Sequence, residues 1–335
     1  MQEVCYGAPN LYFIFAAMGL SNLDADAEMV YIIPRSWTFG AYFKRFRQYF
    51  LTEGKLEHIH LFVSRNKVFD KEDVLQETMI IKVRKTDIIP EEITITSSKS
   101  SRDFDNLTSL TVPYNLVVSG NDYYVYLVTE EKDIAVLKQL HKFKKTLPEI
   151  GLKMKTGLTV DFRNREILRD ETEEGAIPLF YSQHIKHGEV QFPIKKENEY
   201  IVTDQKGLIQ DNRNYLFVKR FTAKEEKRRL QCGIYLSNKY PQYKKISTQN
   251  KINFIDGITT EISECLVYGL YVIFNSTLYD EYYRILNGST QVNSTEINSM
   301  PVPDLESIQE MGKKLMKNRN MSEDNCNKIL EVYCG

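Results

Sequence analysis

Residues 28–51, EMVYIIPRSWTFGAYFKRFRQYFL, decide the fold of the first part of this chain. The stretch opens with a short apolar run that ends at Pro34, as a buried strand does. Its last twelve residues have the period of an amphipathic helix. The aromatic face of that helix comprises Tyr42, Phe43, Phe46, Tyr49 and Phe50, and the polar face Lys44, Arg45, Arg47 and Gln48. A strand followed by such a helix predicts an α/β unit.

The segments around this stretch extend the same pattern. Residues 10–23, NLYFIFAAMGLSNL, favour a helix, and residues 56–64 and 77–85 read as two further strands. Residues 86–122 are rich in Ser, Thr, Asp and Pro, which is typical of a connection with weak strands. We therefore expect an α/β domain over 1–88 and a connection over 89–124.

A second unit is expected over residues 125–335. Its first helix is EEKDIAVLKQLHKF, residues 130–143, and mixed strands and turns follow to about residue 300. Two terminal helices are predicted over residues 304–318 and 322–333, with Asp304 and Glu306 at the start of the first as caps. This order predicts a mixed α+β domain.

Bulk composition bounds the classes of function. The 335 residues are 42% apolar, which is enough for about two domains. A net charge of -1 excludes a chain that is polybasic throughout, so any nucleic-acid site must be a local patch. Five scattered cysteines without metal-ligand spacing indicate reduced thiols in the cytoplasm. The sequence has no membrane-length apolar run and no signal-peptide start.

Familiar enzyme signatures are absent from the sequence. It contains no GxGxxG, Walker or GxSxG motif. His58 and His60 share one face of a strand, but a metal site would need a third ligand, and none is visible. We interpret both as surface strand histidines rather than as metal ligands.

Basic patches are the stronger signal. Residues 153–169 hold five Lys or Arg, and residues 213–229 hold seven against two Glu. Between them lies IPLFYSQHIKHGEVQFP, residues 177–193. Such residues contact DNA phosphates and base edges, although solvated charged faces are the alternative. The candidate DNA contacts here are Lys153, Lys155, Arg163, Arg165, Gln183, His184, Lys186, Lys219 and Arg220.

A polar segment near the C-terminus adds further candidates. Residues 287–303, NGSTQVNSTEINSMPVP, contain many short hydrogen-bonding side chains and no Lys or Arg. Short side chains permit close approach to DNA, and the candidate donors are Ser289, Thr290, Gln291 and Asn293. The alternative is a hydrogen-bonded turn structure that supports the domain.

Four stretches carry a family resemblance: residues 10–15, NLYFIF; 30–51, VYIIPRSWTFGAYFKRFRQYFL; 68–85, VFDKEDVLQETMIIKVRK; and 275–303, NSTLYDEYYRILNGSTQVNSTEINSMPVP. Together they resemble the TaqI-like N6-adenine DNA methyltransferases of type II restriction–modification systems, and the BsuBI/PstI modification methylases in particular. The resemblance implies a Rossmann-like S-adenosylmethionine-binding sheet followed by a DNA target-recognition domain, in the cytoplasm of a bacterium. It suggests CTGCAG as the recognition sequence.

In this family the target adenine is flipped out of double-stranded DNA and gripped by an Asn-Pro-Pro-Tyr motif, so that its amine faces the methyl donor. Phe15 matches a family position that packs near the adenine of the cofactor S-adenosylmethionine; plain core packing is the alternative. The polar segment 287–303 matches the end of the recognition domain.

The chain departs from the family pattern in one respect. It contains no Asn-Pro-Pro-Tyr or Asp-Pro-Pro-Tyr motif, and it lacks the Gly-containing strand–loop that binds the methionine part of the cofactor. Both precede NLYFIF in the family. We therefore expect an incomplete catalytic sheet, and a chain that mainly recognises DNA and needs a missing N-terminal half or a companion subunit. A non-catalytic DNA-specificity protein is the alternative. A third interpretation is a decayed fragment with an exposed apolar sheet edge.

Overall fold

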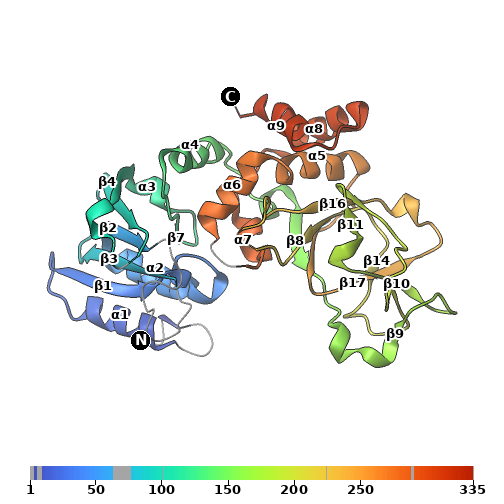
Figure 1. Ribbon diagram of the computed structural model, residues 1–335, viewed down its shortest axis with the longest axis horizontal. Helices are drawn as coiled ribbons and strands as arrows, with labels where there is room; N and C mark the ends of the chain where they lie inside the picture. The colour runs from blue at the N-terminus through green and yellow to red at the C-terminus, as the bar shows by residue number, and fades with distance from the viewer. Residues whose placement is uncertain are drawn as a thin grey trace. The chain divides into compact units, whose positions relative to one another are not determined.

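The computed structural model describes residues 4–5, 10–62, 77–100, 102–223, 225–287 and 290–334. The chain divides into two compact units (Figure 1). The first comprises Met1–Lys138 with Ile285–Gly288, and the second comprises Gln139–Arg284 with Ser289–Gly335. In the described part of the chain, no helix is long and apolar enough to cross a membrane.

A five-stranded sheet forms the centre of the first unit, in the order β1-β3-β2-β4-β5. Strands β2 and β4 are parallel, and the other neighbouring pairs are antiparallel. The elements that build it are α1 (Leu11–Ser21), β1 (Glu28–Pro34), α2 (Lys44–Glu53), β2 (Lys55–Phe62), β3 (Thr78–Arg84), β4 (Glu92–Ser98) and β5 (Thr108–Pro113). After them come α3 (Tyr114–Val117), β6 (Val118–Ser119), β7 (Tyr124–Val125) and α4 (Glu131–Leu140).

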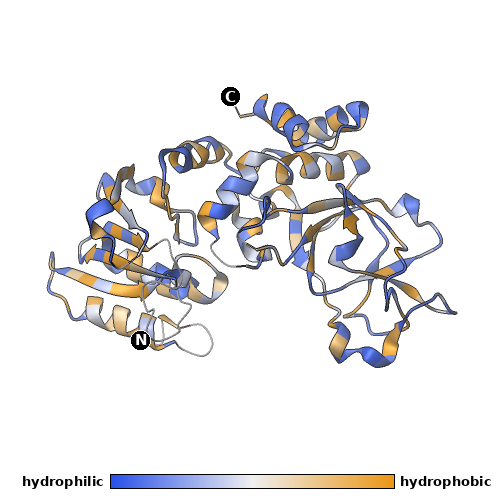
Figure 2. Ribbon diagram, viewed as in Figure 1, coloured by the Kyte–Doolittle hydropathy of each residue, from blue (hydrophilic) through white to orange (hydrophobic). Residues whose placement is uncertain are grey.

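The two faces of this sheet differ. Helices α1 and α2 pack on one face, where Phe13 and Phe46 meet at 5.4 Å between ring centroids. Apolar residues run along β1 (Figure 2), yet Val30 and Ile32 on the opposite face are 67% and 50% exposed. In the register, Val30 lies beside Lys82 of β3, which bonds Glu28 at 3.0 Å and Glu57 at 2.9 Å. Strand β1 pairs only with β3 among the described residues, so it is an edge strand.

The helix predicted within residues 28–51 is present, but its polar face is not wholly solvated. Arg47 is fully buried and donates to the carbonyl oxygens of Trp37 (3.1 Å), Gly40 (2.9 Å) and Asp122 (2.9 Å). Its guanidinium lies 4.7 Å from the ring centroid of Tyr124. Burial of a cation requires such partners, and helical periodicity could not reveal them because they are backbone carbonyls outside α2.

Residues 89–124 were expected to be a connection with weak strands. Strands β4 and β5 lie in this range and extend the first sheet beyond β2. The boundary at 125 moves accordingly, because the first compact unit continues to Lys138.

Two sheets form the second unit. The larger has the order β11-β12-β16-β15-β18-β8, and the smaller β14-β17-β10-β13-β9. The strands are β8 (Leu152–Thr156), β9 (Leu168–Arg169), β10 (Ile177–Phe180), β11 (Ile185–Lys186), β12 (Glu189–Val190), β13 (Tyr200–Ile201), β14 (Gln210–Asp211), β15 (Tyr215–Lys219), β16 (Cys232–Tyr235), β17 (Lys245–Thr248) and β18 (Ile252–Gly257). Aromatic residues fill the core between them, including Phe180, Tyr215, Phe217, Tyr235 and Phe254.

The helices of the second unit include the two predicted at the C-terminus. They are α5 (Glu264–Phe274), α6 (Thr277–Leu286), α7 (Ser294–Ser299), α8 (Leu305–Asn318) and α9 (Glu323–Glu331). Asp304 caps α8, as predicted, by accepting the Ser307 amide at 2.8 Å. Segment 287–303 is more packed than its composition indicated, because it contains α7 and the fully buried Val292, Ile297 and Met300.

Candidate nucleic-acid interface

Three segments of the second unit meet at one end of its larger sheet. Strand β18 lies between β15 and β8, and both pairings are antiparallel. At the start of β18, Ile252 pairs with Lys219, the last residue of β15, and Asn253 pairs with Thr156, the last residue of β8. The chain segments that leave β15 and β8 therefore flank the residues that lead into β18.

Arg220 joins two of these segments to the polar segment 287–303. Its amide donates to Lys251 O (2.9 Å), and its guanidinium donates to Asn250 O (3.0 Å) and Gln291 Oε1 (3.3 Å). The Val292 amide donates to Arg220 O at 2.7 Å, and Phe221 forms a β-bridge with Gln291. The structure thus brings together candidates that lie about seventy residues apart in the sequence.

The segment after β8 completes the arrangement. The Gly157 amide donates to Ile252 O at 2.8 Å, and the Asn250 amide donates to Thr159 O at 2.9 Å. A Cβ atom on Gly157 would overlap the backbone of Gln249, so this close approach requires glycine. Leu158, between these contacts, is 59% exposed.

We call this end of the sheet the basic rim. It comprises Leu158, Lys219, Arg220, Phe221, Lys251, Thr290 and Gln291. Lys251 is exposed, whereas Lys219 Nζ donates to Gln231 Oε1 at 2.9 Å. Lys251 was missed by sequence reasoning because it stands alone in QNKIN, outside any run of charge. Only the strand pairing places it beside Arg220.

Other candidate residues lie away from the basic rim. Lys153 pairs in register with Asp256 further along β18, and Lys155 Nζ bonds Asp256 Oδ2 at 2.8 Å. Lys186 is exposed on β11, the strand at the opposite edge of the same sheet. Asn293 Nδ2 donates to Glu296 Oε1 at 3.2 Å at the start of α7.

Three exposed candidates lie on short turns. Arg163 and Arg165 belong to the 3-10 turns Asp161–Arg163 and Arg165–Ile167, which follow the segment after β8. Gln183 belongs to the turn Ser182–His184. Ser289 lies outside the described residues.

His184 occupies the core, which corrects its place among the DNA candidates. Its side chain is fully buried; the Tyr181 amide donates to Nδ1 at 2.8 Å, and Nε2 lies 2.9 Å from Glu199 Oε1. Burial lowers the pKa of His184, while the bond with Glu199 opposes that shift. The ring holds a turn in place and cannot reach a ligand without local unfolding.

In the first unit, Phe15 is 55% exposed on α1, near Leu11 at 70%, so it is not a core residue. His58 Nε2 and His60 Nδ1 both contact Thr96 Oγ1, at 2.8 and 2.9 Å. His60 is buried, so the prediction that it is a surface histidine is wrong. Among the described residues, no group of three or more His, Cys, Asp or Glu could hold a metal ion.

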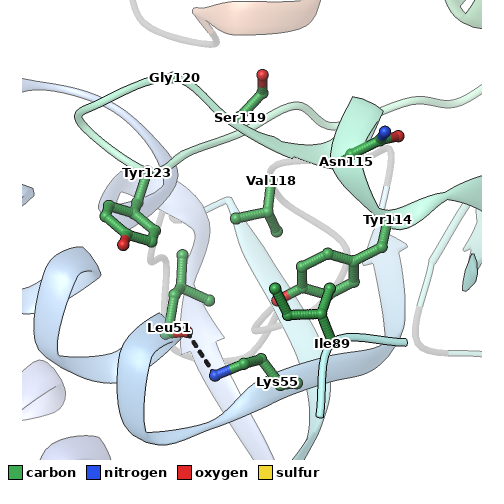
Figure 3. A pocket seen from close by; sticks show the side chains of 9 residues that line it. All are labelled: Leu51, Lys55, Ile89, Tyr114, Asn115, Val118, Ser119, Gly120 and Tyr123. Carbon is green, nitrogen blue, oxygen red and sulfur yellow. Dashed lines mark hydrogen bonds between the residues drawn. The ribbon is translucent and has the colours of Figure 1, made fainter. Parts of the chain in front are cut away.

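The first unit also contains a pocket of about 360 Å³ (Figure 3). Lys55 lies at its base and donates to Leu51 O (3.2 Å) and Thr52 O (2.6 Å), the last carbonyls of α2. Burial lowers the pKa of Lys55, and Asp87 and Glu53 oppose the shift. Its ammonium serves as the C-terminal cap of α2, which accounts for its position in the wall of the pocket.

The sequence of this chain is similar to those of known restriction–modification methyltransferases. Residues 1–69 match the family described as Eco57I restriction-modification methylase. The chain is 35% identical over 324 residues to the type II methyltransferase M.PstI of Providencia stuartii, covering 94% of this chain and 63% of that protein. It is also 35% identical over 314 residues to M.BsuBI of Bacillus subtilis, covering 92% and 62%. The chain therefore spans less than two thirds of the length of these relatives.

A solved structure shares the fold. The type IIL restriction–modification enzyme MmeI, in complex with DNA, aligns with a TM-score of 0.51 and 11% identity over 96% of this chain and 49% of that one. Over almost its entire length, the chain is related to the type II methyltransferases of restriction–modification systems. This confirms the resemblance to the BsuBI/PstI modification methylases.

Proposed function

We propose that this chain is the DNA-recognition part of a site-specific N6-adenine DNA methyltransferase that uses S-adenosylmethionine. The observation that carries the proposal is the basic rim of the second unit, in a chain related to type II methyltransferases. Lys and Arg side chains supply the phosphate contacts that give affinity, and Gln and Asn amides can read base edges. The proposed partner is double-stranded DNA.

The rim offers both kinds of contact. Lys251 is exposed, and its carbonyl oxygen accepts the Arg220 amide, so the two cationic residues are neighbours that can neutralise phosphates. Thr290 and Gln291 lie on the adjoining segment, which the bridge to Phe221 holds against β15.

The first unit supports a catalytic role that this chain completes only in part. Its sheet places β3 between β1 and β2, an arrangement compatible with the end of a Rossmann-like methyltransferase sheet. The edge of β1 and the exposed Val30 and Ile32 would then pack against the part of the enzyme that carries the Asn-Pro-Pro-Tyr motif. More than a third of the length of each relative lies outside the match, which leaves room for that part.

Phe15 fits one wall of a cofactor site. Its exposed ring on α1 can pack on the adenine of S-adenosylmethionine, which supplies the methyl group when bound. The Gly-containing strand–loop for the methionine part is not in this sequence. The residues of this chain would therefore hold DNA in register and cover one side of the cofactor.

Methyl transfer to duplex DNA tests this function. The chain is incubated with radiolabelled S-adenosylmethionine, alone and together with the portion of M.PstI that it does not match. We expect no transfer by the chain alone and N6-methyladenine from the mixture. DNA binding without transfer in either sample would favour the alternative, a non-catalytic DNA-specificity protein. Absence of DNA binding would overturn both proposals.

A further inference from the structure

We propose that two exposed phenylalanines, Phe162 and Phe221, stack on DNA bases whose normal stacking is interrupted. The inference rests on the proposed DNA binding of the second unit and names the part of the DNA that these rings contact. Phe162 is 62% exposed and Phe221 is 45% exposed. The core of the same unit buries many other aromatic rings, so these two stand out as exposed aromatic surface.

Each exposed ring has an arginine beside it. The guanidinium carbon of Arg220 lies 5.5 Å from the ring centroid of Phe221, and that of Arg163 lies 5.5 Å from the centroid of Phe162. Aromatic rings combined with arginine in a cationic groove are the means by which proteins hold unpaired bases. The two pairs place an apolar stacking surface next to a charge that attracts the neighbouring phosphate.

The backbone fixes Phe221 in place before any ligand binds. Its residue is bridged to Gln291, and Arg220 beside it is held by bonds to Asn250 and Gln291. A backbone held in this way loses little conformational entropy on binding. Leu158, 59% exposed on the segment after β8, adds apolar surface to the same rim.

The chemistry of the rim favours DNA as the occupant over a protein. Phosphates alone would satisfy Lys251 and Arg220 but would leave the phenyl rings in water. A purely apolar partner would cover the rings but would leave the cations desolvated without counter-charge. A nucleic-acid strand offers both groups together, a phosphate and a base face, at each nucleotide. Apolar side chains also enter between base steps of duplexes that proteins kink.

The test compares binding of the full chain to an intact duplex and to the same duplex with one mismatched base pair. A mismatched base leaves the stack at lower cost, so we expect the wild-type chain to prefer the mismatched duplex. Phe221→Ala should lose about tenfold in affinity for the mismatched duplex, in the lower part of the range for one base–aromatic stack. Phe162→Ala should show a loss of the same kind. Phe221→Trp should retain the preference.

Ile258→Ala is the matched control. Ile258 is 50% exposed and follows β18 at the end opposite the basic rim, so its removal should leave affinity unchanged. Thermal unfolding of each variant shows that the fold is intact.

The outcomes separate the two proposals. No binding of either duplex by the wild-type chain would refute DNA binding itself. Wild-type binding that Phe221→Ala and Phe162→Ala leave unchanged, or weaken equally on both duplexes, would overturn the stacking role alone. Loss of self-association in these variants, with DNA binding intact, would assign the rings to a protein contact and also overturn it.

Discussion

Lys251 and Arg220 are neighbours in space but differ in what their removal would disturb. Arg220 bonds the backbone and a side chain of two other segments, so Arg220→Ala alters the rim as well as its charge. Lys251 is exposed, and its backbone amide donates to Gln249 Oε1 at 3.0 Å. Truncation of the Lys251 side chain leaves that backbone bond in place. Lys251 is therefore the better probe of phosphate contact.

We predict that Lys251→Ala lowers affinity for every duplex and reduces the slope of log K against log salt by about one. The measurement is fluorescence anisotropy at several salt concentrations. Lys186→Ala is the control, because Lys186 lies on the opposite edge strand of the same sheet. An unchanged slope for Lys251→Ala would remove this residue from the interface, and an equal change in both variants would show only a general charge effect.

His184 leads to a prediction about stability. His184→Ala would remove one of the two bonds of Glu199 Oε1, a carboxylate that is 2% exposed, and would leave the bond from the Ile194 amide at 2.8 Å. Loss of a hydrogen bond to a buried charged group costs about 1–3 kcal/mol, so we expect a loss of that order in the free energy of unfolding. Urea denaturation measures it. His187→Asn is the control: His187 is exposed at φ 52°, a conformation that Asn tolerates, and stability should be nearly unchanged.

At the scale of elements, helices α5 and α8 approach each other backbone to backbone. A Cβ atom on Gly269 would overlap the carbonyl oxygen of Ile308, and one on Gly312 would overlap that of Cys265. Both partners are backbone atoms, so rotamer changes cannot relieve the overlap.

We predict that Gly269→Ala and Gly312→Ala each destabilise the chain by about 1–3 kcal/mol, the usual cost of overpacking, despite the better helix propensity of Ala. Gly207→Ala is the matched control, because no atom lies within 4 Å of its Cβ position. Thermal unfolding compares the three. Equal melting temperatures would contradict the close helix crossing.

The elements also show what sequence could and could not predict. Strand β1, helix α2 and the two C-terminal helices follow from local periodicity and capping residues, and they were predicted. Strands β4 and β5 were expected only as weak strands of a connection, because Ser and Thr are frequent there. Thr96 and Ser98 are nevertheless buried, and both bond the His60 ring. The candidate DNA contacts were named from separate segments of the sequence, but their meeting in the basic rim was not predicted. Its residues meet through the β18 pairings and the Arg220 bonds, which join distant segments.

At the scale of the whole molecule, four histidines share one direction of shift. Burial lowers the pKa values of His58, His60, His141 and His184. Nearby groups lower three of these pKa values further: Lys82 acts on His58, His58 on His60 and Lys144 on His141. For His184, Glu199 instead raises the pKa and opposes the effect of burial. The unfolded chain therefore binds more protons than the folded chain below about pH 6.5, the unperturbed histidine pKa.

We predict that the stability linked to these four neutral histidines is fully present above about pH 6.5. It is lost as the pH falls below that value, because the unfolded chain takes up protons first. The urea midpoint should fall between pH 7 and pH 5. Carboxylates with lowered pKa, such as Glu57 and Asp211, lose their contribution only below about pH 4.5, so the two windows are separate. A midpoint that stays constant or rises down to pH 5 would contradict the burial of these rings.

Strand β1, at the edge of the first sheet, is the place where the chain can pair with another chain in solution. Among the described residues, β1 pairs only with β3, so the other side of its backbone offers unpaired donors and acceptors. Beside this edge, Val30 and Ile32 are 67% and 50% exposed. An apolar edge strand of this kind is a template for pairing with another chain.

We predict that the isolated chain self-associates through β1 and that Ile32→Lys suppresses this association. Lysine on an edge strand disfavours pairing, and the cross-strand neighbour of Ile32 is the uncharged Ile80, so β1 and β3 should stay paired. Sedimentation velocity measures the association. Ile88→Lys is the control, since Ile88 is 76% exposed but lies outside any strand. If β1 also packs against the M.PstI portion, Ile32→Lys should abolish methyl transfer by the mixture while Ile88→Lys does not. Loss of association without loss of transfer would mean that the two chains join elsewhere.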